Sequence, residues 1–470
     1  MFSIILTLAS ASVVQAELQQ EAIQAAKSAT RFLTDSLSTE GGYLWRYSAD
    51  LSLREGEGIV ETQTVWVQPP GTPAVGEAFV RLYQTTGDPQ FRAAALAAAA
   101  ALHQGQMRSG GWQDRVEFEP QRRKKWAYRS EPSRSKAKDQ SSLDDDKTQS
   151  AIRFLIQLDQ ATEFREERVH EMTMTALQAL IGHGQFRNGG FPQVWMDQRT
   201  EIADALQPAA ARYPDSWPRE YPGHRQYWTQ YTLNDNLASD VMKTLFLAEN
   251  VYDDSAYRVA ALRLADSLLT AQMPLPQPAW AQQYNSAFEP IWARKFEPPA
   301  ISGGESQTVM ETLLLAYERS GQAKYLDAVR PALEYLEASV LPDGRLARFY
   351  ELQTNRPLYF NRDYELTYDD SDCPTHYAFK VSNQLERIRA QYERLKTQTS
   401  KAPGDRAQVD KANPVSTKRI QQLIATQDPR GAWVTQAGLR YHRYNGAVIE
   451  MAVMVKHLNQ IADFLSRSDR

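Results

Sequence analysis

Apolar residues recur along most of this chain at intervals of three and four, which places them on one face of an α-helix. This pattern predicts helices over residues 17–37, 75–83, 89–103, 148–160, 167–182, 236–249, 255–272, 306–320, 324–340, 375–396, 418–426 and 444–465. Strand-like patterns are rare and short, near 186–195 and 344–350. The chain is therefore expected to be predominantly helical.

A short turn motif follows several of these predicted helices. It reads GGY at Gly41, GGW at Gly110, GGF at Gly189, DGR at Asp343 and GAW at Gly431. The first intervals are about seventy to eighty residues, and the interval that follows Gly189 is about twice as long. We therefore expect a further member near Gln272, followed by Trp280. Glycine in such turns can end a helix in a left-handed conformation.

Repeated helical pairs without a solenoid consensus favour a closed ring of hairpins. The predicted fold class is all-α, an α/α toroid-like arrangement of repeated helical hairpins with a few short strands and long loops. Two polar segments interrupt the repeat, at 117–142 and at 397–414, and the second has the composition of a flexible loop. We expect a single domain over residues 17–470, with a flexible loop at 397–414.

The first sixteen residues have features of an export signal. The apolar run from Phe2 to Val14 is too short to span a membrane. Val14-Gln15-Ala16 offers a small-x-small cleavage site, although no lysine or arginine precedes the apolar run. We expect a signal peptide over residues 1–16, cleaved after Ala16, and a secreted or periplasmic protein with no membrane partner.

The charge balance limits the partners of the protein. A net charge of −4 argues against general nucleic-acid binding, and a single cysteine excludes both an intrachain disulfide and a cysteine-rich zinc site. A local basic excess contains Arg122, Arg123, Lys124, Lys125, Arg129, Arg134 and Lys136. This segment is either a solvated loop or a wall that attracts an anionic ligand. In the second case Lys125 is a candidate substrate contact.

Three adjacent carboxylates, Asp144, Asp145 and Asp146, stand directly before a predicted helix. Carboxylates at a helix N-terminus interact favourably with the helix dipole, which explains one or two of them. A hard divalent cation would explain all three, because it requires several carboxylate oxygens close together. The run lacks the alternating acids and the glycine of an EF-hand loop. Both interpretations of the triplet remain open at this level.

Four further segments combine polar side chains with stiff turns. Asn234, Asp235 and Asn236 precede another predicted helix, where Asn and Asp are also common caps. The segment NGGFPQVW ends in Trp195, whose ring offers a flat face for a sugar. The two others are WARKFEPPAISGGES, which contains Arg294, and ARFYELQTNRPLYFNRD, which contains Arg348, Arg356 and Arg362. Arginine grips carboxylates with two parallel hydrogen bonds, so these segments suit an anionic ligand.

Taken together and in this order, these motifs resemble the pectate lyases of polysaccharide lyase family ten, the pectic acid lyases. The resemblance runs from about Gly110 to Tyr377. It implies an α/α toroid-like fold and calcium-dependent β-elimination of polygalacturonate. The calcium loop of the family usually reads Asp-Asn-Gly, so Asp144 and Asp145 correspond to its first two residues, whereas Asp146 replaces the glycine. Asp235 resembles the second calcium-side aspartate.

The resemblance also implies roles for the arginines. Arg294 resembles the catalytic arginine, and Arg348 and Arg362 resemble the arginines that bind the substrate carboxylate. Arg356, Trp195 and Lys125 are further candidate substrate contacts. An arginine base is demanding, because the pKa of a free guanidinium lies above about 12.

Two alternatives remain at this stage. The chain could be a non-catalytic protein that binds acidic polysaccharides, or a toroid glycoside hydrolase, which needs two opposed carboxylic acids such as Glu297, Glu305 or Asp343. The preferred hypothesis is a monomeric pectate lyase with Ca²⁺ as cofactor.

Overall fold

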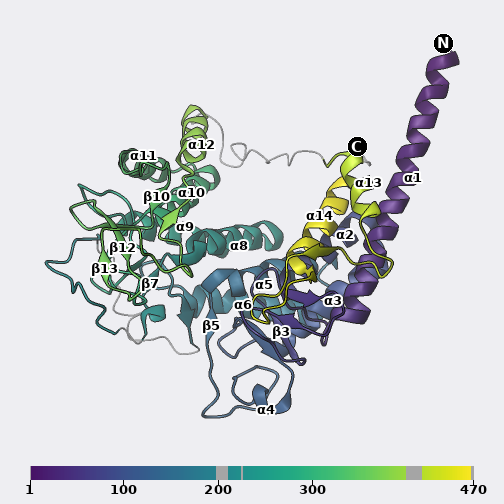
Figure 1. Ribbon diagram of the computed structural model, residues 1–470, viewed down its shortest axis with the longest axis horizontal. Coiled ribbons are helices and arrows are strands. Elements are labelled where there is room, and N and C mark those ends of the chain that lie inside the picture. Colours follow the sequence, from purple (N-terminus) through teal and green to yellow (C-terminus); the bar gives the residue numbers. More distant parts are fainter. Residues whose placement is uncertain (1, 197–209, 224–225, 399–414, 467–470) are drawn as a thin grey trace. The chain divides into compact units, whose positions relative to one another are not determined.

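The computed structural model describes residues 2–196, 210–223, 226–398 and 415–466 (Figure 1). Most of the loop expected at 397–414 lies outside these residues. The chain divides into two compact units. The first unit comprises Met1–Asp139, Ser150–Leu177 and Asp410–Arg470, and the second comprises Gln140–Gln149 and Gln178–Val409.

The described residues form mainly helices, which short strands and turns connect. The α-helices are α1 (Phe2–Phe32), α2 (Thr72–Thr86), α3 (Pro89–Gly105), α4 (Pro120–Arg123), α5 (Lys147–Ala161), α6 (Glu167–Ala179), α8 (Leu237–Tyr252), α9 (Ser255–Thr270), α10 (Gly303–Ser320), α11 (Ala323–Ala338), α12 (Leu385–Thr397), α13 (Thr417–Ala425) and α14 (Met451–Leu465). Three 3₁₀ turns are η2 (Asp144–Asp146), η4 (Tyr227–Thr229) and η5 (Asn234–Asn236), and two π-turns are η1 (Leu33–Leu37) and η3 (Leu180–Gly184).

The strands are all two to four residues long. They are β1 (Arg46–Ser48), β2 (Arg54–Glu55), β3 (Thr64–Trp66), β4 (Arg115–Glu117), β5 (Ser141–Ser142), β6 (Val194–Trp195), β7 (Tyr231–Thr232), β8 (Gln283–Tyr284), β9 (Ala300–Ser302), β10 (Leu346–Ala347), β11 (Phe349–Glu351), β12 (Pro357–Phe360), β13 (Leu366–Thr367), β14 (Lys380–Val381), β15 (Val434–Gln436) and β16 (Ala447–Glu450). The predicted fold class, helical hairpins with short strands and long loops in the manner of an α/α toroid, is confirmed.

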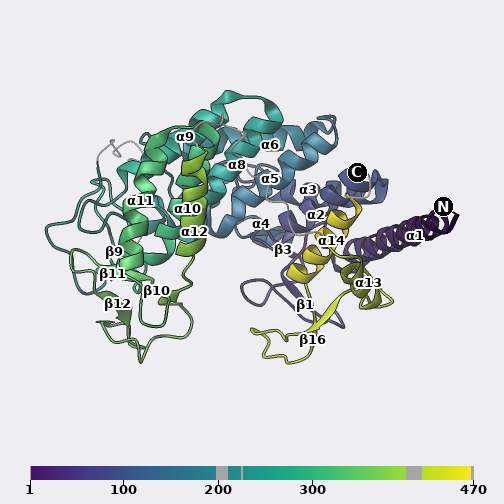
Figure 2. The same cartoon turned by 90° about the horizontal axis from the view of Figure 1, so that it is seen from above.

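Antiparallel helical pairs form the frame of each unit. In the first unit α2 packs against α3 and α14, and α1 packs against α3, α13 and α14. In the second unit the pairs are α8 with α9 and α10 with α11, and α12 lies beside α10 and α11 (Figure 2). The residue that ends the first helix of a pair is left-handed in three cases, at Gly87, Asp253 and Gly321.

The second unit also contains a small antiparallel sheet in the order β13-β12-β11-β9. Phe349 of β11 faces Ser302 of β9 on one side and Leu358 of β12 on the other. Trp292 and Phe379 pack against Phe360 of β12 and form an aromatic cluster with the buried residues of this sheet. β9 leads directly into α10, so the sheet fixes the start of that helix.

The predicted turn repeat is confirmed, including the member expected near Gln272. The five turn glycines, Gly41, Gly110, Gly189, Gly344 and Gly431, all have φ between 82° and 98°. A glutamine before the turn hydrogen-bonds both to the turn and to a neighbouring helix at Gln106, Gln185, Gln272 and Gln427. The indole N–H of Trp280 donates to the carbonyl of Leu268, as those of Trp112 and Trp433 donate to Leu102 and Leu423.

Crowding explains why the turn requires glycine at some of these positions. A Cβ on Gly189 would lie 2.1 Å from the carbonyl oxygen of Arg263 in α9. A Cβ on Gly41 would similarly lie 2.2 Å from the carbonyl oxygen of Ala97 in α3. Both distances are shorter than real Cβ contacts, so the backbones can approach only without a side chain.

One residue of each turn hydrogen-bonds through its backbone carbonyl to the segment that leads into a different helix. In the second unit the carbonyls of Gln193, Gln282 and Arg348 accept the backbone N–H groups of Leu143, Leu233 and Gly303, at 2.8, 2.9 and 3.0 Å. Gln193 and Arg348 each follow their turn glycine by four residues. Three equivalent backbone positions therefore bring three side chains to the segments that lead into α5, α8 and α10.

Two predicted helices begin later than expected. The range 375–396 becomes helical only at Leu385, because Phe379 belongs to the aromatic cluster and β14 pairs with β10. The range 444–465 becomes helical at Met451, because Ala447–Glu450 forms strand β16 between β15 and β1. Tertiary packing overrides the local helical pattern in both places.

The N-terminal helix α1 carries the expected signal sequence and part of the core. Gln15, Ala16 and Glu17 are exposed, and Leu18 is the first buried residue for which burial is described. No helix in the described part of the chain is both long and apolar enough to cross a membrane.

Candidate active site

Two loops of the second unit have the same backbone design. Each consists of a two-residue strand, a leucine and a 3₁₀ turn, followed by a helix. The central residues, Asp145 and Asp235, both have a left-handed backbone conformation. Asp145 has φ 47° and ψ 41°, and Asp235 has φ 52° and ψ 42°. Aspartate and asparagine tolerate this conformation better than most residues with a Cβ. The sequences LDDDK and LNDNL therefore fold alike, and η2 packs against η5.

The two loops bring three carboxylates together. One carboxylate oxygen from each of Asp144, Asp145 and Asp235 lies within 4.8 Å of the other two. Among the residues that the structure describes, this is the only group of three or more metal-ligating side chains of this kind. The three predicted metal ligands thus meet in one place, although they come from positions about ninety residues apart.

Asp144 is held from two sides. The ammonium of Lys147 lies 2.6 Å from its Oδ2, and the side-chain amide of Gln193 donates to its Oδ1. Burial disfavours the charged form of this carboxyl, but Lys147 and Gln193 outweigh burial and lower its pKa. Asp144 is therefore an ionised carboxylate at neutral pH.

Asp235 is in the opposite situation. Its Oδ2 accepts a hydrogen bond from the side chain of Asn234. Burial, together with repulsion from Asp145, Asp144 and Glu305, raises its pKa to about 8. Burial and neighbouring carboxylates both disfavour a negative charge on Asp235, so its neutral form is favoured.

The donors of the cluster fit a hard divalent cation such as Ca²⁺, because all are oxygen atoms on closely spaced side chains. The side-chain oxygen Oδ1 of Asn234 is buried and has no hydrogen-bond partner in the structure, so a further oxygen is available there. Asp146, which replaces the glycine of the family motif, has φ of 61°, the left-handed conformation that glycine enters freely. The replacement of glycine by Asp146 therefore preserves the backbone conformation of the turn.

Arg294 lies near this cluster, and its partner is Glu297. Its Nε and Nη2 are 2.8 and 2.5 Å from the two carboxylate oxygens of Glu297, and its backbone N–H donates to the same group. The Glu297 side chain is almost fully buried, whereas that of Arg294 is 38% exposed. Burial opposes the charge on Arg294, but Glu297 outweighs burial and raises the pKa of the guanidinium. The pKa of Glu297 is lowered in return.

Arg348 is a second cation that interacts with the acidic cluster. Its guanidinium lies 3.6 Å from the carboxylate of Glu305 and 4.7 Å from the centre of the Tyr377 ring. Tyr377 connects the two arginines, because its hydroxyl donates to Glu297 and its ring also lies under Arg294. The charges of Glu305 and Asp235 both act on Arg348. The acidic cluster, Arg294 and Arg348 therefore form one electrostatically connected site.

The structure places the other two predicted arginines elsewhere in the second unit. Arg356 stacks over the ring of Tyr368 at 3.3 Å, and Arg362 pairs at 3.2 Å with Asp372. Both arginines are exposed. No described interaction joins either of them to the acidic cluster.

Trp195 is 3% exposed and packs near Gly184, so its ring is part of the core. The expected stacking role of Trp195 therefore has no exposed face to support it.

Lys125 belongs to a loop of the first unit, residues 120–138, in which arginines and lysines behave differently. Each arginine is at least partly buried and pairs with a glutamate: Arg122 with Glu117, Arg123 and Arg134 with Glu131, and Arg129 with Glu171. By contrast, Lys124, Lys125, Lys136 and Lys138 are exposed and form no ion pair within the described residues. The backbone N–H of Lys138 donates to the carbonyl of Lys125, which holds two of them side by side. We call this segment the lysine loop.

Sequence reasoning missed several side chains of the site. Gln193 and Gln282 occupy repeat positions equivalent to that of Arg348, so the turn spacing could have indicated them. Lys147 carried no signal of its own, because a lysine at the start of a helix is usually solvated. Glu297 was expected only as a candidate acid of a hydrolase, a role for which its lowered pKa is unsuitable.

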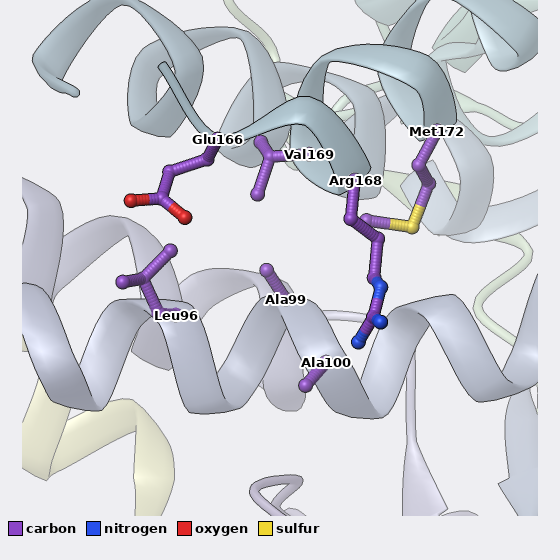
Figure 3. A pocket seen from close by; sticks show the side chains of 7 residues that line it. All are labelled: Leu96, Ala99, Ala100, Glu166, Arg168, Val169 and Met172. Carbon is purple, nitrogen blue, oxygen red and sulfur yellow. The ribbon is translucent and has the colours of Figure 1, made fainter. Parts of the chain in front are cut away.

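Two cavities in the described part of the chain lie away from the acidic cluster and have few reactive side chains in their lining. One cavity of about 340 Å³ in the first unit lies between α3 and α6 (Figure 3). Its lining is mostly apolar, and its Glu166 forms an ion pair with Arg92. Another cavity, of about 470 Å³, lies beside Arg389 in the second unit, where Arg389 pairs with Glu337.

Comparison with known families agrees with the motifs. The family described as pectic acid lyase matches residues 106–204 and 206–316. This match contains Asp144, Asp145, Asp235 and Arg294, and ends before Arg348. No curated protein matches the chain.

Several solved structures are similar in fold. A family 10 polysaccharide lyase from Cellvibrio cellulosa is 20% identical over 69% of this chain and 97% of its own, with a TM-score of 0.46. A mutant of that lyase in complex with trigalacturonic acid is 19% identical over 69% and 98%, also with a TM-score of 0.46. A family 76 mannosidase from Bacteroides thetaiotaomicron is 11% identical over 96% and 100%, with a TM-score of 0.45.

Proposed function

Because the pectic acid lyase family matches residues 106–204 and 206–316 of this chain, we propose that the protein cleaves α-1,4-polygalacturonate by calcium-assisted β-elimination. The observation that supports this proposal most strongly is the meeting of Asp144, Asp145 and Asp235 in a site that also contains Arg294 and Arg348. Carboxylates that suit a divalent cation and arginines that suit a uronate carboxylate are the two requirements of this chemistry.

The reaction removes the proton at C5 of a galacturonate and breaks the bond between C4 and the glycosidic oxygen. The electrons of the C5–H bond form the C4–C5 double bond, and the departing oxygen takes up a proton to become a hydroxyl. The C5 proton becomes sufficiently acidic only when positive charge stabilises the enolate that develops from the carboxylate. Groups that bind this charge more strongly in the transition state than in the ground state accelerate the step.

Each part of the site then has a proposed role. Asp144, Asp145 and Asp235 hold Ca²⁺, which when bound supplies positive charge to the substrate carboxylate. Arg348 hydrogen-bonds the same carboxylate, and its position is fixed by the turn that precedes it. Arg362 and Arg356 contact uronates farther along the polysaccharide. Lys125 and the other lysines of the lysine loop attract the polyanion.

Arg294 is proposed as the group that removes the C5 proton. Glu297 opposes this role, since it raises the pKa of the guanidinium. The ion pair uses Nε and Nη2, so Nη1 remains for the substrate. Neutralising the acidic cluster removes negative charge near Arg294 and lowers its pKa, so proton removal becomes coupled to cation binding and to alkaline pH.

The remaining proposals concern the whole chain. Cleavage after Ala16 would leave Leu18 and the rest of the buried face of α1 intact, which supports a signal peptide over residues 1–16 and a secreted or periplasmic protein. We propose that residues 17–470 act as a single catalytic domain and that the protein is a monomer. N-terminal sequencing and sedimentation of the exported protein test these proposals.

The decisive experiment measures the ultraviolet absorbance of polygalacturonate at alkaline pH, with Ca²⁺ and then with a chelator. A calcium-dependent rise from unsaturated uronate ends supports the lyase. New reducing ends without this rise would identify a glycoside hydrolase instead. Substrate binding without any new ends would identify a binding protein.

A further inference from the structure

The first loop of the acidic cluster contains a cation of its own. The ammonium of Lys147 lies 2.6 Å from Oδ2 of Asp144, and its side chain is only 8% exposed. Lys147 is the first residue of α5 and is separated from Asp144 by three positions. The ammonium is thus buried in direct contact with one of the three carboxylates that would bind the metal.

The second loop shows that the fold does not require this lysine. Residue by residue, Asn234, Asp235, Asn236 and Leu237 occupy the positions of Asp144, Asp145, Asp146 and Lys147. Leu237 starts α8 as Lys147 starts α5, and it is apolar and buried. A charged side chain is therefore not needed to begin the helix at this position.

The difference between the loops is one of charge. The first loop has two carboxylates, Asp144 and Asp146, where the second has the neutral side chains of Asn234 and Asn236. It also has an ammonium where the second has a leucine. The additional positive charge partly balances the additional negative charges, and it does so from inside the site.

We propose that Lys147 is an internal counter-cation, which pairs with the carboxylate of Asp144 and thereby lowers the affinity of the acidic cluster for Ca²⁺. This inference rests on the proposed calcium role of the cluster. A divalent ion that binds beside Asp144 must either displace the ammonium or remain close to it, and both cost free energy through like-charge repulsion at low dielectric. Lys147 is a positioning residue in this scheme, since it acts on the metal through Asp144.

The effect of removing the charge has a fixed sign. Without the ammonium, Asp144 loses its ion-pair partner in the metal-free protein, and the bound metal loses a repulsive neighbour. Both changes favour the metal-bound state. We expect Ca²⁺ to bind at least about tenfold more tightly to Lys147→Gln than to the natural protein.

Isothermal titration of the metal-free full chain with CaCl₂ alone measures this directly. Lys147→Leu, which introduces the residue found at the equivalent position Leu237, is a second variant in case the Lys147→Gln protein does not fold. Lys147→Arg keeps the charge and should retain weak binding. The matched control is Lys243→Gln, because Lys243 forms the same type of pair with Asp240 in α8, at 3.3 Å, but is 56% exposed.

The outcomes separate this inference from the proposed function. Tighter binding by Lys147→Gln or Lys147→Leu, with Lys147→Arg and Lys243→Gln unchanged, supports the counter-cation. Calcium binding by the natural protein with equal or weaker binding by both charge-removing variants overturns it. If neither the natural protein nor the variants bind Ca²⁺, the calcium role itself fails.

Discussion

Arg294 and Glu297 form a two-point ion pair in which Nε and Nη2 of the arginine contact the two carboxylate oxygens at 2.8 and 2.5 Å. A nearly fully buried carboxylate in this position keeps the guanidinium charged and fixes its orientation. The proposed base is thus well positioned, but its proton is held strongly. Any mechanism that uses Arg294 as a base depends on how the site offsets Glu297.

Glu297→Gln should shift the pH–activity profile to lower pH. The substitution preserves the shape of the side chain and removes the charge that raises the pKa of Arg294. We expect a lower maximal turnover as well, because the amide holds the guanidinium less firmly. The measurement is kcat against pH at saturating calcium. Glu351→Gln, which alters the pair of Glu351 with Arg219 elsewhere in the second unit, is the control. An unshifted profile would remove Arg294 as the base.

Asp144→Ala and Asp235→Ala should each raise the calcium concentration needed for half-maximal activity by at least about tenfold, since each removes a charged oxygen ligand. Calorimetric titration with Ca²⁺ should show the same loss of affinity. The exposed Asp369, which hydrogen-bonds only locally to Ser371, provides the control variant Asp369→Ala. Full activity of both cluster variants in chelator would exclude the calcium role.

The metal-free protein should become less stable as the pH rises from about 4 to about 8. The pKa of Asp235 is raised to about 8 in the folded chain, whereas an unfolded aspartate titrates near 3.9. The folded state therefore holds a proton in this range that the unfolded state has released, so the free energy of unfolding falls with pH. Asp144, whose pKa is lowered, contributes only below its ordinary pKa.

Urea unfolding in chelator at several pH values measures this slope, and Asp235→Asn should reduce it. Saturating Ca²⁺ should also reduce it, because the bound cation removes the repulsion that raises the pKa. A slope that is the same in the natural protein and in Asp235→Asn would contradict the assignment.

Replacing Lys124, Lys125, Lys136 and Lys138 together by glutamine should weaken the binding of long polygalacturonate by on the order of fivefold at low salt. Turnover of a trimer should change little, since the proposed chemistry lies in the second unit. A control with the same change of net charge replaces four exposed lysines outside the loop, Lys243, Lys324, Lys396 and Lys418. Equal losses in the two variants would mean that the lysine loop has no specific role.

Gly189→Ala should destabilise the protein far more than Gly344→Ala. Both glycines belong to the turn repeat and have positive φ, but a Cβ on Gly189 would collide with the carbonyl of Arg263, whereas nothing lies within 4 Å of a Cβ on Gly344. We expect a loss of about 3 kcal/mol or more for Gly189 and about 1 kcal/mol for Gly344, by urea unfolding. Equal losses would show that conformation alone determines the glycine requirement.

Much of the fold could be predicted from the sequence because its repeat is local. The turn near Gln272 lacks the glycine of the other members, yet its spacing and Trp280 were sufficient to locate it. The errors arose where distant segments decide the structure. Phe379 has helical spacing in the sequence but packs with Trp292, and the segment around Val448 pairs with β1, which lies about four hundred residues earlier.

The site could be predicted only in part for the same reason. Asp144 and Asp235 stand out because each lies in a short polar run before a helix. Gln193 and Lys147 do not, since a glutamine in a turn and a lysine on a helix are usually exposed. Their importance comes from contact with Asp144, and for Gln193 that contact spans forty-nine positions of the chain.

The equivalent backbone positions of Gln193, Gln282 and Arg348 have a consequence for how such an enzyme can change. Each of these positions brings one side chain to the site from a backbone carbonyl that accepts a main-chain hydrogen bond. The identity of that side chain is therefore free to vary while the scaffold stays constant. Substrate preference can diverge one hairpin at a time, by single substitutions that leave the other anchors in place.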